Sequence, residues 1–158
     1  MSSTFLPRLV KEINANYRHT NLTYLKNILN SFPETNYREL LDAFRTKSSH
    51  SIYNNHYYKF RIYSNNNYEI NIINWNNHSR SKIHNHAENG CILKVLEGSL
   101  LEKKYNTDLL LIDTNTLEPG KTHYINNTEL HSIENTNNGI SYSLHIYSPP
   151  NFSAKTFN

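Results

Sequence analysis

The spacing of hydrophobic residues changes its period near residue 57. Before that point, apolar side chains recur every three or four residues, which is the spacing of one helix face. From there on, apolar residues such as Phe60 and Ile62 alternate with charged ones, which is the period of a strand. The pattern therefore predicts a helical segment over residues 1–46 and a β-rich body over residues 57–150.

A length of 158 residues fits one compact domain, so we expect residues 1–158 to form a single domain. Helices are expected around residues 5–13, 22–29 and 37–44. Strands are expected in a hairpin over 57–72 and at Cys91–Leu96, Leu100–Tyr105, Leu109–Ile112, Thr122–Ile125, Leu130–Ile133 and Tyr142–Tyr147. Many short strands around a ligand cluster predict an all-β double-stranded jelly-roll barrel, with the helices packed at one end.

The charge and the apolar content exclude several classes of partner. The net charge is +3, but the basic residues are scattered, and the tightest pair is Lys103 and Lys104, so we expect no nucleic-acid partner. No apolar run is long enough to span a membrane, and the N-terminus lacks the apolar core of a signal peptide. We therefore expect no membrane contact, a cytoplasmic location and a monomer.

Three histidines have the spacing of metal ligands. His84 and His86 stand two residues apart, so on a strand both side chains point to one face. His131 comes from another expected strand and can complete a three-nitrogen face around a metal ion. The lone cysteine, Cys91, lies close by in sequence and has no disulfide partner, which leaves a buried thiol, a reactive group or another covalent bond.

The histidines belong to a longer set of motifs. These are Ser81-x-Ile83-His84-x-His86, Cys91-x-Leu93-Lys94, Leu96-x-Gly98-x-Leu100-x-Glu102, Leu130-His131-x-x-Glu134-Asn135 and the tail Ser143-Leu144-His145-Ile146-Tyr147-Ser148-Pro149-Pro150. The histidine motifs resemble the two halves of the cupin signature, in which a glutamate ligand follows the second histidine by five positions. Cys91 stands at that position here. With this cysteine and the tail, the chain from about Tyr57 to Pro150 resembles the cysteine dioxygenase family of cupins.

The resemblance implies a mononuclear Fe2+ centre held by His84, His86 and His131. It also implies a thiol dioxygenase that uses O2 to oxidise L-cysteine to cysteine sulfinic acid. Three neutral imidazoles leave the full charge on the ion and one face open, which suits a thiolate. Cys91 in place of glutamate vacates the position that this thiolate needs.

The tail has a role of its own in this interpretation. Ser143, His145 and Tyr147 alternate along one expected strand, so they face one side and can form a hydrogen-bonded chain that orients the phenol toward the metal. In the family that this pattern resembles, the cysteine and the tyrosine are joined by a thioether. We therefore predict a crosslink between Cys91 and Tyr147.

The expected binding site for the substrate carboxylate departs from the family pattern. Family members place an arginine shortly after a tyrosine on the first barrel strand. Counting from Tyr57, that position holds Lys59, while Arg61 lies two residues further on the same strand face. Both remain candidates for the carboxylate, and a lysine offers a point charge without the bidentate fork of arginine.

Other functions remain open at the level of sequence. The substrate can be another small thiol, such as 3-mercaptopropionate or cysteamine, because Lys59 replaces the arginine. A non-enzymatic cupin that binds a metal or small ligand needs the three histidines but not Ser143, His145 and Tyr147. A different metal-dependent cupin enzyme usually retains the glutamate ligand that Cys91 replaces. Trp75 is interpreted as a packing residue.

Overall fold

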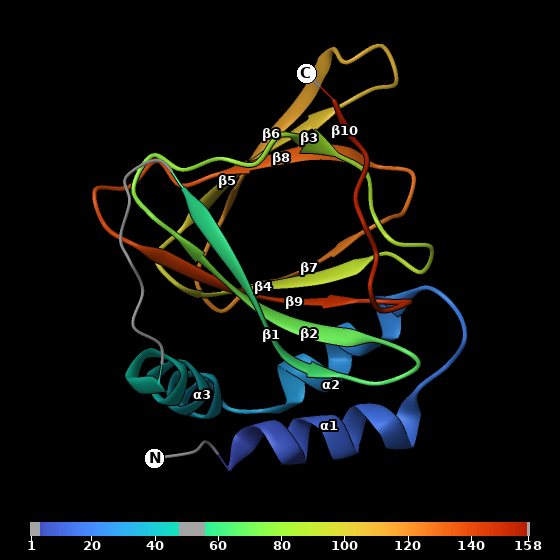
Figure 1. The fold of residues 1–158 in the computed structure, drawn as a ribbon, viewed down its shortest axis with the longest axis vertical. Helices are drawn as coiled ribbons and strands as arrows, with labels where there is room; N and C mark the ends of the chain where they lie inside the picture. The colour runs from blue at the N-terminus through green and yellow to red at the C-terminus, as the bar shows by residue number, and fades with distance from the viewer. Residues whose placement is uncertain (1–3, 48–55, 158) are drawn as a thin grey trace.

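A computed structural model describes residues 4–47 and 56–157 (Figure 1). The helical segment consists of α1 (Phe5–Asn16), η1 (Leu22–Tyr24), α2 (Leu25–Ser31) and α3 (Glu34–Lys47). The helices confirm the predicted positions and pack against the outer face of one sheet (Figure 1). None of the helices in the described part of the chain is long and apolar enough to cross a membrane.

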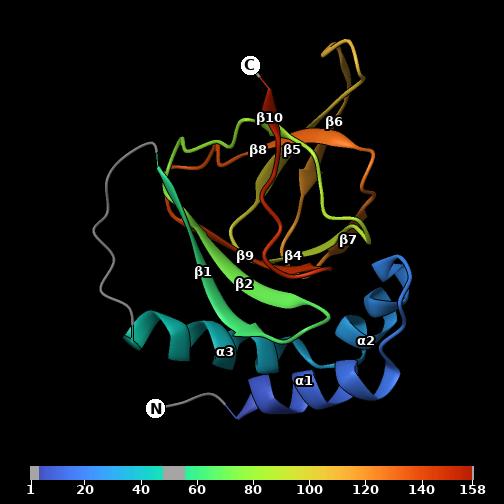
Figure 2. The ribbon, with the colours of Figure 1, turned by 45° about the vertical axis from the view of Figure 1, so that its right-hand side comes forward.

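The described residues of the β-rich body form two five-stranded sheets that face each other (Figures 1 and 2). The first sheet has the order β1-β2-β9-β4-β7, with β1 (Tyr57–Ser64), β2 (Glu69–Trp75), β9 (Ser141–Tyr147), β4 (Cys91–Glu97) and β7 (Thr122–Ile125). The second has the order β10-β3-β8-β5-β6, with β10 (Thr156–Phe157), β3 (Ile83–His84), β8 (Leu130–Glu134), β5 (Leu100–Tyr105) and β6 (Leu111–Leu117). The named strands of the described residues pair antiparallel in both sheets, which confirms the predicted barrel. The assignment of residues 1–158 to one domain stays a prediction.

The three central strands of the first sheet, β2, β9 and β4, are buried on both faces, and their residues divide between two apolar clusters. Even-numbered residues such as Ile72 and Leu144 pack with the helices in one cluster. Odd-numbered residues such as Ile73 and Leu93 turn toward the second sheet and form the other cluster. Because strand side chains alternate, the helices cover one face and leave the opposite face free to carry the polar residues of a site.

The predicted strand Leu109–Ile112 is confirmed only at Leu111 and Ile112 and is wrong at Leu109 and Leu110. Leu109 has a positive φ of 62° and lies in the turn after β5, where the side chain of Asn106 accepts hydrogen bonds from the backbone of Asp108 and Leu110. Strand β6 begins at Leu111 and continues to Leu117 through polar residues that the pattern did not include. The short strands β3 and β10 were also missed, because two residues are too few to show a period.

Candidate metal centre

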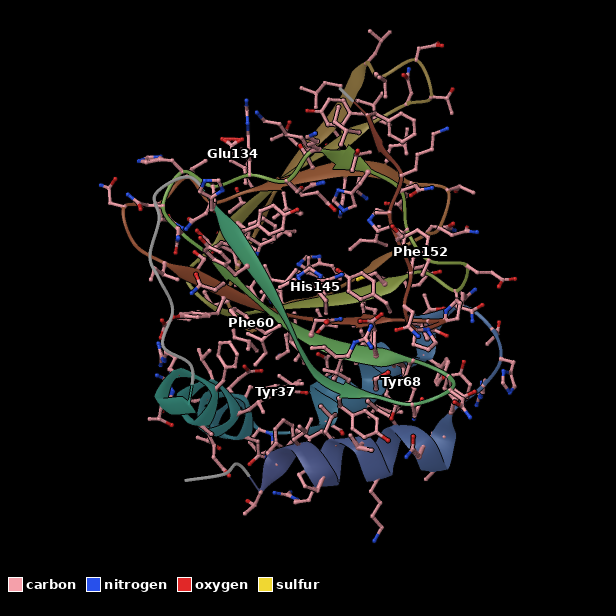
Figure 3. All side chains as sticks on the ribbon, viewed as in Figure 1. Tyr37, Phe60, Tyr68, Glu134, His145 and Phe152 are labelled. Carbon is pink, nitrogen blue, oxygen red and sulfur yellow. The ribbon has the colours of Figure 1, made fainter. Side chains whose placement is uncertain are left out.

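A cavity of about 490 Å³ lies between the two sheets. Eight of the ten predicted site residues line it: Tyr57, Lys59, His84, His86, Cys91, His131, His145 and Tyr147. The other two, Arg61 and Ser143, are not part of the lining. Figure 3 shows the ring of His145 in the space between the sheets.

Strand pairing brings the three predicted ligand histidines together. His84 of β3 and His131 of β8 are direct partners across the two strands, and His86 follows two residues after His84. The ring centroids lie 4.4 Å apart for the closest pair and 5.0 Å for the most distant. One ligand nitrogen from each ring lies within 4.8 Å of the other two. The cluster thus has the size of a metal-binding site.

Backbone carbonyls fix the orientation of two of the rings. Nδ1 of His84 lies 2.8 Å from the carbonyl oxygen of Lys82, and Nδ1 of His86 lies 3.0 Å from that of Glu129. A carbonyl oxygen only accepts, so each Nδ1 carries the proton and donates it. Nε2 of each ring therefore keeps a free lone pair, as a metal ligand requires.

The third ring is held by a buried carboxylate. Nδ1 of His131 lies 2.8 Å from Oε2 of Glu102, and both side chains are buried. An ionised Glu102 accepts the Nδ1 proton and leaves Nε2 of His131 free. Glu102 comes from β5, the neighbour of β8, and was missed as a site residue although it stands in one of the sequence motifs. The sequence signal for Glu102 is its place two residues after Leu100 in that motif, which puts both side chains on one face of the strand.

Burial keeps the histidines neutral. Desolvation, followed by the charges of His131 and His84, lowers the pKa of His86 to about 2. Desolvation also lowers the pKa of His131 well below its ordinary value, and that of His84 to a smaller extent. Neutral imidazoles are the form that binds a metal ion, so little proton competition is expected at physiological pH.

The distance between two of the rings tests whether a metal ion fits. Nε2 of His86 and Nε2 of His131 lie only 2.9 Å apart. With both protons on the Nδ1 atoms, two lone pairs face each other, which is unfavourable unless a cation lies between them. Two nitrogen atoms that bind the same metal ion, each at about 2.0–2.1 Å from it, can lie this close together. The donor set therefore fits a metal ion.

Cys91 and Tyr147 meet on the opposite wall of the cavity. They are direct partners in the antiparallel pairing of β4 with β9, and such partners have Cβ atoms roughly 4.5–5.5 Å apart. Cys91 is 1% exposed, and burial raises the pKa of its thiol. Desolvation, with Cys91 and Glu69 adding to it, raises the pKa of the Tyr147 hydroxyl. Both groups are therefore protonated at neutral pH.

A family model described as cysteine dioxygenase type I matches residues 37–158. This range includes the three histidines, Cys91 and Tyr147. The chain belongs to the cysteine dioxygenase type I family.

Curated relatives agree with this assignment. The chain is 35% identical to cysteine dioxygenase type 1 of Danio rerio over 86 residues, which are 49% of this chain and 43% of the relative. It is 36% identical to the protein of the same name from Rattus norvegicus over 78 residues, which are 44% of this chain and 39% of the relative. The match therefore spans less than half the length of these relatives.

Solved structures support the cupin fold. A structure described as that of DMSP lyases aligns with a TM-score of 0.62 at 15% identity and covers 90% of this chain and 82% of its own. An uncharacterized protein from Klebsiella pneumoniae with a double-stranded β-helix domain aligns with a TM-score of 0.58 at 12% identity, over 68% of this chain and 90% of its own. At these identities the likeness concerns the fold alone, and it confirms the jelly-roll cupin.

A chain of polar contacts leads to Tyr147 in this family member. Nε1 of Trp75 donates to Oγ of Ser143 at 2.9 Å, and Oγ lies 2.7 Å from Nε2 of His145. Nδ1 of His145 lies 3.2 Å from the Tyr147 hydroxyl and 3.8 Å from Sγ of Cys91. Trp75, interpreted as a packing residue, therefore also bonds into the predicted Ser–His–Tyr chain. The sequence could not reveal this, because the contact depends on β2 lying beside β9.

The two candidates for the substrate carboxylate have different surroundings. Lys59 lines the cavity, and its Nζ lies 5.1 Å from the centre of the Tyr147 ring. Arg61 instead pairs with Glu69 at 3.2 Å and donates to the side chain of Asn151 at 2.8 Å. The structure therefore leaves Lys59 as the candidate that faces the site. Tyr57 also lines the cavity and stacks on Trp75, with 4.7 Å between ring centroids.

Proposed function

We propose that this chain is a thiol dioxygenase that converts a small carboxylate-bearing thiol and O2 into a sulfinic acid, with L-cysteine as the first candidate substrate. The observation that carries the proposal is a three-histidine cluster that shares one cavity with Cys91 and Tyr147. The similarity to cysteine dioxygenase type 1 of Danio rerio and Rattus norvegicus supports the same reaction.

His84, His86 and His131 are the residues that would hold the iron. When bound, ferrous iron would supply the centre at which a thiol and dioxygen react. The overall reaction adds both oxygen atoms of O2 to the thiol sulfur, which is thereby oxidised while O2 is reduced. Because burial keeps the three imidazoles neutral, they do not offset the positive charge that attracts a thiolate.

Lys59 is placed to bind the carboxylate of the substrate. Its ammonium lies above the Tyr147 ring at the cavity wall, opposite the histidine cluster. A single ammonium offers one point charge, so it fixes the position of a carboxylate less strictly than a bidentate guanidinium. We therefore expect this chain to accept several carboxylate-bearing thiols and to reject cysteamine, which has no carboxylate.

The polar chain sets the direction of the Tyr147 hydroxyl proton. Trp75 Nε1 can only donate, so Ser143 accepts from it. We assign the remaining Ser143 proton to the hydrogen bond with Nε2 of His145. His145 then carries its proton on Nδ1 and donates it to the Tyr147 oxygen. The Tyr147 proton is thus free to point into the cavity, where it can donate to a bound ligand.

The pairing of Cys91 with Tyr147 supports the proposed thioether. Bond formation between Sγ and a ring carbon removes one hydrogen from the thiol and one from the ring, and one O2 takes up both protons and both electrons as H2O2. The predicted product is a protein lighter by two hydrogen atoms. Tyr147 would then be fixed at the cavity wall beside Lys59.

Anaerobic loading with ferrous iron, followed by oxygen uptake and product mass, tests the function. Cysteine, cysteamine and 3-mercaptopropionate are compared side by side, and a product heavier by two oxygen atoms is expected from the carboxylate-bearing thiols. His131→Ala should abolish uptake, while His19→Ala, an exposed histidine outside the cavity, should leave it unchanged. Bound iron without uptake for any thiol would refute the dioxygenase and favour a metal-binding cupin.

A further inference from the structure

The charged side chains that line the cavity are all cationic. They are Lys59 from β1, and Arg80 and Lys82 from the segment between β2 and β3. Among the described residues, no aspartate or glutamate lines the cavity. Because charges of one sign add in a partly closed cavity, the lining favours anionic ligands.

These three cations have no carboxylate partner in the described part of the chain. Five basic residues of this part do, because Arg45, Arg61, Lys94, Lys103 and Lys104 each form an ion pair, whereas exposed residues outside the cavity such as Lys11 and Lys121 have none either. Glu134, whose backbone pairs with that of Arg80, directs its carboxylate to Lys103 at 3.5 Å. The positive charge of the lining is therefore available to a ligand.

The backbone places Arg80 and Lys82 together. They alternate with Ser79 and Ser81, which are buried. Two hydrogen bonds fix this segment to β8: the Ser81 amide donates to the Ile133 carbonyl at 2.8 Å, and the Ile133 amide donates to Oγ of Ser81 at 2.9 Å. Arg80 and Lys82 therefore share one face of this segment and line the cavity on the side of the second sheet, while Lys59 lies on the first sheet. All three residues are exposed, so they lie where the cavity opens to solvent.

The cavity offers more room than a small amino acid needs. Its volume of about 490 Å³ falls within the roughly 300–1,000 Å³ typical of pockets for drug-sized ligands. A three-carbon thiol bound between the histidines and Lys59 would fill only part of this volume, and Arg80 and Lys82 belong to the same lining. A second anionic group on the ligand would occupy the remaining space and contact Arg80, because a guanidinium can donate two parallel hydrogen bonds to one carboxylate.

We infer that Arg80 and Lys82 form a second carboxylate site, so that the cavity prefers a thiol with two carboxylates over one with a single carboxylate. This inference rests on the proposed function, because it places the thiol at the histidine cluster and the first carboxylate at Lys59. The substrate class is thus a small dicarboxylic thiol.

Mercaptosuccinate and 3-mercaptopropionate test this preference, because they differ by one carboxylate. Binding of each is measured by calorimetry on the iron-loaded protein without oxygen. The test variant is the double substitution Arg80→Gln and Lys82→Gln. The control is Lys11→Gln with Lys121→Gln, which removes the same charge from two exposed residues outside the cavity lining.

The wild type should bind mercaptosuccinate about tenfold more tightly than 3-mercaptopropionate, as expected for two partly solvated charge contacts. The double variant should lose this preference, and the control should keep it. Equal binding of the two thiols, no binding of either, or a preference that survives in the double variant would overturn the second site. Oxygen uptake after air is admitted reports the proposed reaction separately, since a binding preference without uptake refutes only the oxidation.

Discussion

The carboxylate of Glu102 lies 2.8 Å from Nδ1 of His131, and both side chains are almost completely buried. Glu102 stands on β5 and His131 on β8, so the pairing of these strands sets the orientation of the ring. Burial raises the pKa of Glu102, and the charge of Lys104 opposes this shift. The hydrogen bond keeps Nε2 of His131 directed at the other two histidines.

Glu102→Gln should weaken metal binding. Glutamine keeps the shape but loses the negative charge, and its amide can turn an N–H rather than an oxygen toward the ring. The affinity for ferrous iron, measured by calorimetry without oxygen, should fall roughly 10- to 100-fold. Glu134→Gln is the control, because Glu134 pairs with Lys103 and does not contact the histidines. An unchanged affinity in Glu102→Gln would show that the carboxylate does not support the site.

The thiol of Cys91 should resist alkylation in the folded, metal-free protein. Burial raises its pKa, so the reactive thiolate is scarce even at pH 8.5, and the side chain is 1% exposed. The reaction of the folded protein with iodoacetamide, monitored by mass spectrometry, should be roughly a hundredfold slower than that of the protein unfolded in urea. Rapid labelling of the folded protein would contradict the buried position. After turnover with iron, thiol and O2, the unfolded protein should also stay unlabelled if the thioether has formed.

Alternation along strands made most of the site predictable from sequence. It placed Ser143, His145 and Tyr147 on one face. His84 and His86 do lie together, but β3 ends at His84, so the expectation that both stand on one strand is wrong. Strand order was not predictable in the same way. Trp75 reaches Ser143 because β2 lies beside β9, and Glu102 reaches His131 because β5 lies beside β8.

The choice between Lys59 and Arg61 also needed the three-dimensional structure. Both residues stand on the same strand face, and sequence spacing treats them alike. Lys59 and Arg61 are both paired in regular register with β2, so the register does not separate them. Arg61 differs because it pairs with the buried carboxylate of Glu69, and it is not part of the cavity lining. An ion pair of this kind is a tertiary feature that a period-two pattern does not contain.

Glu34→Ala should destabilise the protein through Lys94. The Lys94 side chain is fully buried, and its Nζ lies 2.8 Å from Oε1 of Glu34 and 2.9 Å from the Gly120 carbonyl. Removal of Glu34 leaves a buried charge with fewer partners. Because Glu34 is 61% exposed, water can replace its carboxylate in part. We therefore expect the free energy of unfolding to fall by about 1–2 kcal/mol, which is less than the 3–5 kcal/mol typical of breaking a fully buried pair.

A double-mutant cycle separates this effect from others at the start of α3, where an acidic residue also favours the helix. In a Lys94→Met background, Glu34→Ala should change the free energy of unfolding in urea by only about 0.5 kcal/mol. Equal losses in the two backgrounds would mean that Glu34 and Lys94 are not coupled.

Gly90→Ala should destabilise the fold beside Cys91. Gly90 has a φ of +87°, and a Cβ atom there would lie 2.6 Å from the backbone oxygen of Ile125. The left-handed conformation alone costs roughly 1–2 kcal/mol for alanine, and a backbone oxygen cannot move aside as a side-chain end can. We expect a total loss of about 3 kcal/mol in urea unfolding. Gly139→Ala is the matched control, since no atom lies within 4 Å of its added Cβ, and it should stay within about 0.5 kcal/mol of the wild type. Similar losses of stability in both variants would show that the close approach of β7 does not exclude a Cβ atom at Gly90.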